Sequence, residues 1–169
     1  LRRPHYLQAT AVNALPVSPL AAKPAQPKRV LVTGGAGFLG QALVRALREA
    51  PPSLAQPLEL IAYDLVDAPG MPTIRGDILD RQALEAALAG IDAVVHSAVV
   101  VDWSDLRAEQ MQAVNVRGTQ TVVDACVAAG VWALVHTSTI DVLCGGGDVH
   151  LATEQTPYPP RFLDAYGRT

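Results

Sequence analysis

The stretch "TGGAGFLG", residues 33–40, decides the fold because it separates two different hydrophobic patterns. Before it, "KRVLVTG" at 28–34 is a short apolar run of the kind that a buried parallel strand makes. After it, apolar residues recur at helical spacing until two prolines, Pro51 and Pro52, end the pattern. A strand, a glycine-rich turn and an amphipathic helix in this order predict an α/β fold. The expected inward face of the helix is Leu39, Leu43, Ala46 and Leu47.

The glycines of this turn suit a bound dinucleotide. Gly34 permits a tight turn, Gly37 lets the backbone approach a pyrophosphate, and Gly40 lets the helix pack closely on the strand. Phe38 and Leu39 open the helix, where free N–H groups and the helix dipole favour phosphate. The alternative is a glycine-rich turn that binds nothing.

Asp64 bears on the choice of nucleotide. It ends the next strand, 24 residues after Gly40, about where an acid reaches the ribose hydroxyls. A carboxylate there accepts hydrogen bonds from a free 2′-hydroxyl and repels a 2′-phosphate. No Arg or Lys lies between Asp64 and Arg75 to bind that phosphate. We therefore expect NAD rather than NADP as the cofactor.

The rest of the chain alternates strands with helices. Asp80 caps a short helix that ends at Gly90, and a longer helix over 105–129 closes at Gly130. This alternation predicts a Rossmann-type, doubly wound parallel sheet with helices on both faces. The further strands are expected at 58–64, 73–77, 92–101 and 132–139. The inward residues of the long helix are expected to be Val116, Val122, Val123 and Val127.

Charge and cysteine usage exclude some classes of partner. Residues 30–169 carry eight arginines, no lysine and sixteen acidic residues, a net charge of −8. Nucleic-acid binding needs clustered cations, so no nucleic-acid partner is expected. Cys126 and Cys144 stand in no metal or redox spacing, so we expect no metal site and two reduced thiols in an intracellular protein.

The first 28 residues differ from the rest. They are rich in Pro and Ala, lack acids and show no helix or strand period, which predicts a disordered tail before a domain at 29–169. A targeting segment for an organelle is the alternative. No transmembrane helix is expected, because the apolar run 125–140 has only sixteen residues and is broken at Gly130.

Several motifs add a family resemblance. The glycine spacing Gly-x-x-Gly-x-x-Gly resembles the extended branch of the short-chain dehydrogenase/reductase superfamily. Within that branch, "HSAVVVDW", "NVRGTQ" and "HTSTIDV" are similar to the 3β-hydroxysteroid dehydrogenase and sterol-4-carboxylate dehydrogenase family. The matching segments are "GDILD" (76–80), "VVHSA" (94–98), "NVRGTQTVVDAC" (115–126) and "LVHTSTIDV" (134–142).

The resemblance implies roles for residues around the cofactor. Asp77 and Ile78 match the pair that holds the adenine, and Ala98 ends the strand that lies under the cofactor. Thr137 is expected to line the cofactor. Asn115 matches a structural asparagine that orders backbone and water.

The resemblance also implies the chemistry. A tyrosine acts as acid and base on the substrate oxygen, a lysine four residues later lowers its pKa, and a Ser or Thr hydroxyl holds that oxygen. Tyr166 matches the tyrosine, and Thr139 matches the hydroxyl, with Ser138 as the alternative if the register differs by one. The chain ends at Thr169, one position before the lysine, so we expect an N-terminal part that lacks the substrate region and is inactive alone.

Three functions stay open at this point. The first is an NAD-dependent oxidoreductase acting on the CH–OH group of a 3β-hydroxysteroid or sterol, a hydrophobic alcohol or ketone. The second is a nucleotide-sugar epimerase or dehydratase, although those enzymes usually have a tyrosine–glycine pair where this chain has Leu143-Cys144. The third is a non-catalytic NAD-binding module. Trp103 either packs or touches a flat substrate, His96 and His136 are expected to pack, and a homodimer is left open.

Overall fold

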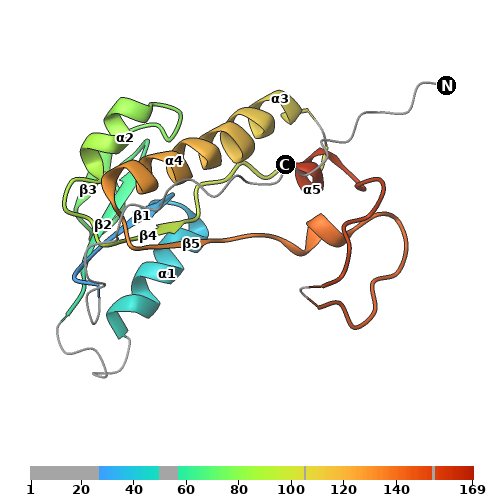
Figure 1. Cartoon of the computed structure of the whole chain (residues 1–169), viewed down its shortest axis with the longest axis horizontal. Coiled ribbons are helices and arrows are strands. Elements are labelled where there is room, and N and C mark those ends of the chain that lie inside the picture. The colour runs from blue at the N-terminus through green and yellow to red at the C-terminus, as the bar shows by residue number, and fades with distance from the viewer. Residues whose placement is uncertain (1–26, 50–56, 105, 154) are drawn as a thin grey trace.

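A computed structural model describes residues 27–49, 57–104, 106–153 and 155–169. In the described part, five parallel strands form one sheet in the order β3-β2-β1-β4-β5 (Figure 1). This order and the parallel pairing confirm the predicted Rossmann-type sheet. The strands are β1 (Arg29–Thr33), β2 (Glu59–Asp64), β3 (Thr73–Arg75), β4 (Ala93–His96) and β5 (Ala133–His136).

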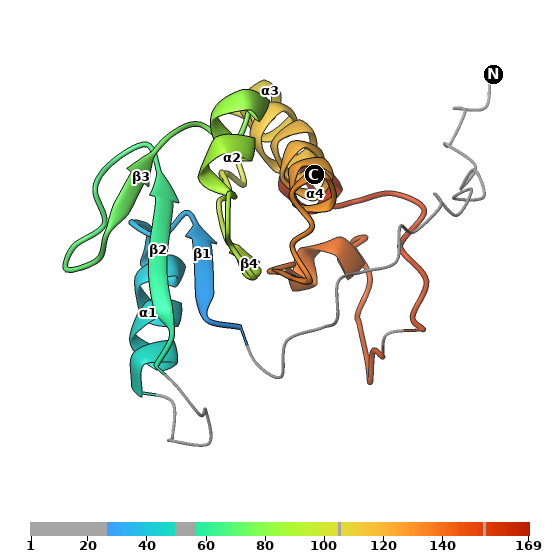
Figure 2. The ribbon, with the colours of Figure 1, turned by 60° about the vertical axis from the view of Figure 1, so that its left-hand side comes forward.

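Helices cover both faces of the sheet, as predicted. Helix α1 (Phe38–Glu49) lies on one face, and α2 (Arg81–Ala87) lies on the other with α4 (Thr119–Ala129) (Figure 2). Each face has its own apolar core, because successive side chains of a buried strand point to opposite sides. Leu31 and Val94 lie in the core under α2 and α4, whereas Val32 lies in the core under α1.

The long helical segment differs from its predicted inward face. It runs through α3 (Ala108–Met111), the π-helix η1 (Gln112–Gly118) and α4, and it ends at Gly130 in the left-handed conformation. Of the predicted inward valines only Val122 is buried, whereas 37%, 36% and 68% of Val116, Val123 and Val127 are exposed. The inward residues are Met111, Asn115, Gly118, Val122, Ala125 and Cys126.

Close packing by small residues explains this correction. A Cβ atom on Gly118 would lie 2.6 Å from the Ile78 side chain, so the helix approaches its neighbour more closely than a larger residue allows. The same holds for α1, where Gly40 and Val44 are buried while Leu39 and Ala46 are exposed. The inward faces of these helices are thus set by the close contacts at Gly40 and Gly118, which a count of apolar residues does not detect.

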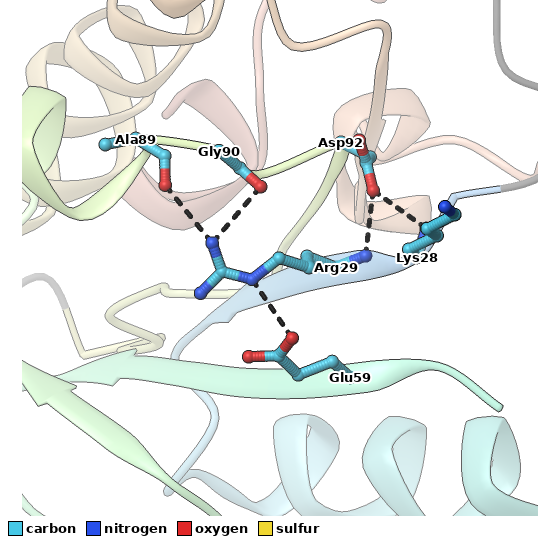
Figure 3. A network of polar contacts seen from close by, with 6 residues as sticks. All are labelled: Lys28, Arg29, Glu59, Ala89, Gly90 and Asp92. Atoms are coloured by element: carbon cyan, nitrogen blue, oxygen red, sulfur yellow. Dashed lines mark hydrogen bonds and ion pairs between the residues drawn. The ribbon is translucent and has the colours of Figure 1, made fainter.

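A polar network fixes the amino ends of the strands (Figure 3). Arg29 Nε donates to Glu59 at 3.1 Å, and its Nη1 donates to the carbonyl of Gly90 at 3.3 Å. Asp92 Oδ2 accepts from the backbone N–H groups of Lys28 and Arg29 at 2.8 and 2.9 Å, and these bonds hold the Asp92 pKa below its usual value. The network joins β1 to β2 and to the α2–β4 connection, at the sheet edge opposite the glycine turn.

Some expectations fall outside the described residues. The predicted tail lies there except for its last two residues, and so do Pro51 and Pro52. Within the ranges that the structure describes, no helix has the length and apolar character needed to cross a membrane.

Candidate active site and cofactor site

The glycine turn is tight, as predicted. Gly34 has φ +70°, and a Cβ atom there would lie 2.7 Å from the backbone nitrogen of Ala98. Its N–H donates to the Tyr63 carbonyl at 3.0 Å, and its own carbonyl accepts from the Gly37 N–H at 3.0 Å. An L-residue at position 34 would be strained and would also collide with the backbone of Ser97 and Ala98, just after β4, so glycine is required there.

Gly40, which was expected to let the helix pack closely on the strand, has a different contact. A Cβ atom on Gly40 would collide with the Gly34 carbonyl, so α1 starts directly against the backbone of the turn rather than against a strand. Gly35, which the sequence reading did not single out, is also constrained, because its Cβ would lie 2.8 Å from that of Ala62. Gly37 is exposed, which leaves its backbone accessible to a ligand.

Asp64 lies beside this turn at the carboxyl end of β2. Its Oδ2 accepts a hydrogen bond from the Ala36 N–H at 3.0 Å, which directs the carboxylate toward the glycine turn. The first residues of α1, Phe38 and Leu39, are 93% and 44% exposed. A carboxylate, an exposed helix start and the exposed Gly37 thus lie together, and this arrangement fits a ribose and its pyrophosphate.

A cation lies near Asp64 but is already paired. Arg75 is the register partner of Asp64 in the neighbouring strand β3. Its guanidinium donates to Asp67, with Nε 2.7 Å from Oδ1, and both side chains are about two-thirds exposed. The pairing raises the Arg75 pKa and lowers that of Asp67. Arg75 is therefore held by an acid rather than available to a phosphate.

Asp77 and Ile78, the pair expected at the adenine, differ in their exposure to solvent. Asp77 is exposed, and its Oδ1 accepts from the Leu79 N–H at 2.9 Å. The Tyr63 hydroxyl donates to the Asp77 carbonyl at 3.1 Å, and burial raises the Tyr63 pKa. Ile78 is 6% exposed and packs in the core against Gly118. Asp77 is thus the member with a side chain free to meet a ligand.

Two histidines lie at the carboxyl ends of β4 and β5. His96 is buried, with Nδ1 2.6 Å from the Thr33 hydroxyl and Nε2 2.9 Å from that of Thr119. Burial, together with the neighbouring His136, lowers the His96 pKa to about 4, so the ring is neutral at pH 7. His96 packs as predicted. The His136 ring, 5.2 Å away and stacked, is exposed and faces a cavity, contrary to the packed role predicted for it.

This cavity brings most of the predicted catalytic and nicotinamide-side residues together. It opens where the ends of β4 and β5 meet η1, η2 (Ile140–Leu143) and α5 (Ala165–Arg168). Its lining is Ala98, Val99, Asn115, Thr119, His136, Thr137, Ser138, Thr139, Val142, Tyr166 and Thr169. Segments up to about 70 residues apart in the sequence thus contribute to one site.

Thr139 caps η2 and already has a partner. Its hydroxyl donates to Asp141 Oδ2 at 2.9 Å and accepts from the Asp141 N–H at 3.3 Å. The sequence reading missed Asp141, although a Thr two residues before an Asp at a helix start is a capping signal. Ser138 is exposed and lines the same cavity, so both residues that the sequence offered for the active hydroxyl line it.

Tyr166 is held in the cavity by the start of α5. Asp164 caps this helix by accepting from the Gly167 N–H at 2.7 Å. A Cβ on Gly167 would lie 2.7 Å from the Asp141 carbonyl, so α5 abuts η2. The Tyr166 ring meets Trp103 edge to face, with centroids 6.3 Å apart at 85°. Sequence spacing gave no signal for this aromatic pair.

Asn115 orders the backbone, as its predicted role requires. Its Oδ1 accepts from the Val100 N–H and its Nδ2 donates to the Val100 carbonyl, both at 2.9 Å. Nδ2 also lies 3.1 Å from the Thr169 hydroxyl. The Thr137 hydroxyl donates to the His96 carbonyl at 3.1 Å, which joins the ends of β4 and β5. Among the described residues, no group of three or more His, Cys, Asp or Glu could hold a metal ion.

Solved structures with this arrangement bind NAD. A short-chain dehydrogenase/reductase superfamily protein from Agrobacterium tumefaciens with bound NAD matches with a TM-score of 0.70 and 35% identity, over 83% of this chain and 41% of that one. The dTDP-glucose 4,6-dehydratase DesIV from Streptomyces venezuelae, with NAD and TYD bound, matches at 0.71 and 34%, over 83% and 47%. The sheet and glycine turn thus define a Rossmann domain of the short-chain dehydrogenase/reductase class.

Sequence comparisons place the chain more closely. Residues 31–169 match the model of the 3-beta hydroxysteroid dehydrogenase/isomerase family, and the chain belongs to this family of oxidoreductases. The 3-beta-hydroxysteroid dehydrogenase of Mycolicibacterium neoaurum is 37% identical over 83% of the chain, and the human sterol-4-alpha-carboxylate 3-dehydrogenase (decarboxylating) is 36% identical over 85%. The chain spans 40% and 38% of these two proteins.

Proposed function

We propose that the protein is an NAD-dependent dehydrogenase that oxidises the 3β-hydroxyl group of a steroid or sterol-like alcohol. The observation that carries this proposal is the single cavity that both Thr139 and Tyr166 line at the carboxyl ends of β4 and β5. Ligands of open α/β sheets bind at this edge. Membership of the 3-beta hydroxysteroid dehydrogenase/isomerase family supports the choice of a steroid-like substrate.

The residues around the glycine turn fit NAD. The exposed backbone of Gly37 would let a pyrophosphate approach the start of α1, and Asp64 would offer its carboxylate to the ribose diol. Asp77 lies further along the same edge, where the adenine is expected. When bound, NAD supplies a hydride acceptor for the carbinol carbon.

The protein's own residues would handle the substrate oxygen and its proton. The phenolate form of Tyr166 takes up the hydroxyl proton and becomes a neutral phenol as the alcohol becomes a ketone, and Thr139 donates a hydrogen bond to the same oxygen. For this, the Thr139 hydroxyl must leave its bond to Asp141. Substrate binding would therefore exchange one hydrogen bond for another at Thr139.

The second candidate is a nucleotide-sugar epimerase or dehydratase. It is favoured by the structural likeness to DesIV, a dTDP-glucose 4,6-dehydratase. Leu143-Cys144 argues against it, because those enzymes usually carry a tyrosine–glycine pair there. A non-catalytic NAD-binding module is the third candidate.

One assay separates these functions. The protein as expressed from its gene is incubated with NAD and either a 3β-hydroxysteroid, its 3α-epimer or dTDP-glucose, and NADH formation and sugar products are followed. The proposal expects NADH with the 3β-hydroxysteroid and at least tenfold less with the 3α-epimer. Conversion of dTDP-glucose alone would establish the second function, and NAD binding without turnover of any of them would establish the third.

A further inference from the structure

The loop between β4 and α3 presents an unusual number of exposed apolar side chains beside the cavity. Val99, Val101 and Trp103 are 47%, 39% and 67% exposed. Val99 lines the cavity, and Trp103 touches Tyr166. Single exposed apolar residues are ordinary, but a cluster next to a polar catalytic pair points to an apolar ligand.

The loop is fixed at both of its ends. Asn115 holds the backbone of Val100 through a pair of 2.9 Å hydrogen bonds. Asp102 folds the following turn, because its carboxylate accepts from the N–H groups of Ser104 and Arg107, both at 2.9 Å. These bonds, with one from the Ser104 hydroxyl, lower the Asp102 pKa. Trp103 therefore lies on a turn that hydrogen bonds hold in place, and most of its surface is exposed.

The geometry at Trp103 leaves ring surface for a ligand. Its contact with Tyr166 is edge to face, so the two ring planes are nearly perpendicular rather than stacked. An indole ring offers a large, flat apolar surface at a low cost in conformational entropy. Both carboxylate oxygens of Asp102 are committed to the turn, and Val99, Val101 and Trp103 offer a ligand apolar contacts.

We propose that Trp103 determines substrate specificity by stacking on the flat rings of an apolar, fused-ring alcohol whose hydroxyl group meets Tyr166. This inference rests on the proposed function for the role of Tyr166, and it adds the residue that recognises the body of the substrate. A sugar nucleotide presents hydroxyl groups along its length, which the valines of this loop cannot satisfy. The class of ligand that fits is therefore a steroid-like alcohol.

Tryptophan fluorescence tests the inference without turnover. The chain has two tryptophans. Trp132 lies at the amino end of β5, whereas Trp103 follows the carboxyl end of β4. In a Trp132→Phe background the emission therefore reports on Trp103. Adding a 3β-hydroxysteroid should quench or shift this emission in a saturable way, whereas dTDP-glucose should not. A response to dTDP-glucose alone, or no response to the steroid, would overturn the inference.

Kinetics provide the second arm. Trp103→Ala should raise KM for the steroid about tenfold or more while kcat changes less than about threefold, since loss of one stacked ring weakens binding by about 1.4 kcal/mol or more. Trp103→Phe should lie between, and Trp132→Phe should match the wild type. An unchanged KM in Trp103→Ala, with an unchanged melting temperature, would refute the role. Saturable quenching by steroid without NADH formation would uphold Trp103 binding and refute the proposed function instead.

Discussion

Asp64 Oδ2 accepts a hydrogen bond from the backbone N–H of Ala36 at 3.0 Å, which joins the end of β2 to the glycine turn. The proposed function has this carboxylate meet the ribose of the nucleotide, where it would repel a 2′-phosphate. We expect the protein to bind NAD at least tenfold more tightly than NADP, or about 1.4 kcal/mol. Titration calorimetry with both nucleotides measures the ratio, and equal affinities would contradict the assignment.

Arg75 gives this prediction a second step. Asp64→Ala should narrow the preference for NAD by removing the repulsive charge. Arg75 is paired with Asp67, so adding Asp67→Ala should free the guanidinium and narrow the preference further. Asp67→Ala alone should leave NAD affinity unchanged within about twofold. If the double variant selects against NADP as strongly as Asp64→Ala, then Arg75 does not reach the 2′-position.

The second prediction concerns the two adjacent hydroxyls. Thr139→Ala should lower kcat by about 10²-fold or more, the loss expected when a positioned donor is removed from a developing oxyanion. Thr139→Ser keeps the hydroxyl and should be mild, and Ser138→Ala is the matched control. A large loss in Ser138→Ala with a small one in Thr139→Ala would assign the donor to Ser138.

The third prediction is a pH dependence of stability that originates at His96. The His96 pKa is lowered from 6.5 to about 4 in the folded protein by burial and by His136. The unfolded chain therefore binds more protons here between pH 6.5 and 4, so stability falls as the pH falls through this window. The difference amounts to at most about 3 kcal/mol.

Paired unfolding curves isolate this effect. His96→Gln should have a lower free energy of unfolding than the wild type at pH 7, and this difference should shrink as the pH approaches 4. His150→Gln removes an exposed histidine and should follow the wild-type curve at every pH. A gap between wild type and His96→Gln that stays constant from pH 7 to 4 would show that His96 does not cause the dependence.

The fourth prediction concerns the network at the amino ends of the strands (Figure 3). Asp92→Ala should lower the free energy of unfolding by about 1–2 kcal/mol, because it leaves the N–H groups of Lys28 and Arg29 without their acceptor. Asp67→Ala breaks an exposed, solvent-screened ion pair and should lower the free energy of unfolding less than Asp92→Ala does. Urea unfolding measures both.

The pH dependence of Asp92 has the opposite sign to that of His96. The Asp92 pKa is lowered in the folded protein, so its stabilising contribution is present above the unfolded pKa of about 4. The contribution is lost as the pH falls through the lowered folded value. The loss of unfolding free energy caused by Asp92→Ala should therefore be largest near pH 7 and should vanish in strong acid. A cost that does not change with pH would rule out the charged form as its source.

The sequence predicted the sheet well because its signals are local. Every strand except β3 is a short, mostly apolar run, the glycine turn sits between a strand and a helix, and Gly130 closes α4 in the left-handed conformation. Hydrophobicity predicted the inward faces of α1 and α4 only in part, because Val122 is buried and Leu47 packs against the core whereas Leu39 and Val127 are exposed. Contacts of backbone at Gly40 and Gly118 decide which side faces inward, and their closeness depends on tertiary packing.

Residues of the candidate site could be predicted from the sequence only where each of them lies in a recognisable motif. Thr139 and Tyr166 come from separate motifs, and both reach one cavity. The contacts of His96 with Thr33 and Thr119, by contrast, join residues 63 and 23 positions apart. The contact of Trp103 with Tyr166 depends on the fixed loop before α3. Such pairs follow from loop conformation, which no sequence periodicity encodes.

The last prediction concerns Tyr166, which lies 27 residues after Thr139 and lines the same cavity. Tyr166→Phe removes the phenol oxygen that, when ionised, takes up the proton, and it keeps the ring that meets Trp103. It should therefore abolish dehydrogenation in the protein as expressed from its gene, while NAD affinity changes less than about twofold. Tyr158→Phe, at an exposed position, should keep full activity. Activity that survives in Tyr166→Phe would remove this residue from the mechanism.

A separate experiment tests the need for the lysine that the family resemblance implies four residues after this tyrosine. Residues 167–169 read Gly-Arg-Thr, and Arg168 is exposed whereas Tyr166 faces the cavity. Residues four apart share a helix face and residues two apart do not, so Arg168 is a poor substitute for a lysine. Residues 1–169 assayed alone should therefore bind NAD without oxidising a steroid, and Arg168→Gln should leave this unchanged. Steroid oxidation by residues 1–169 alone would show that Tyr166 works without a neighbouring lysine.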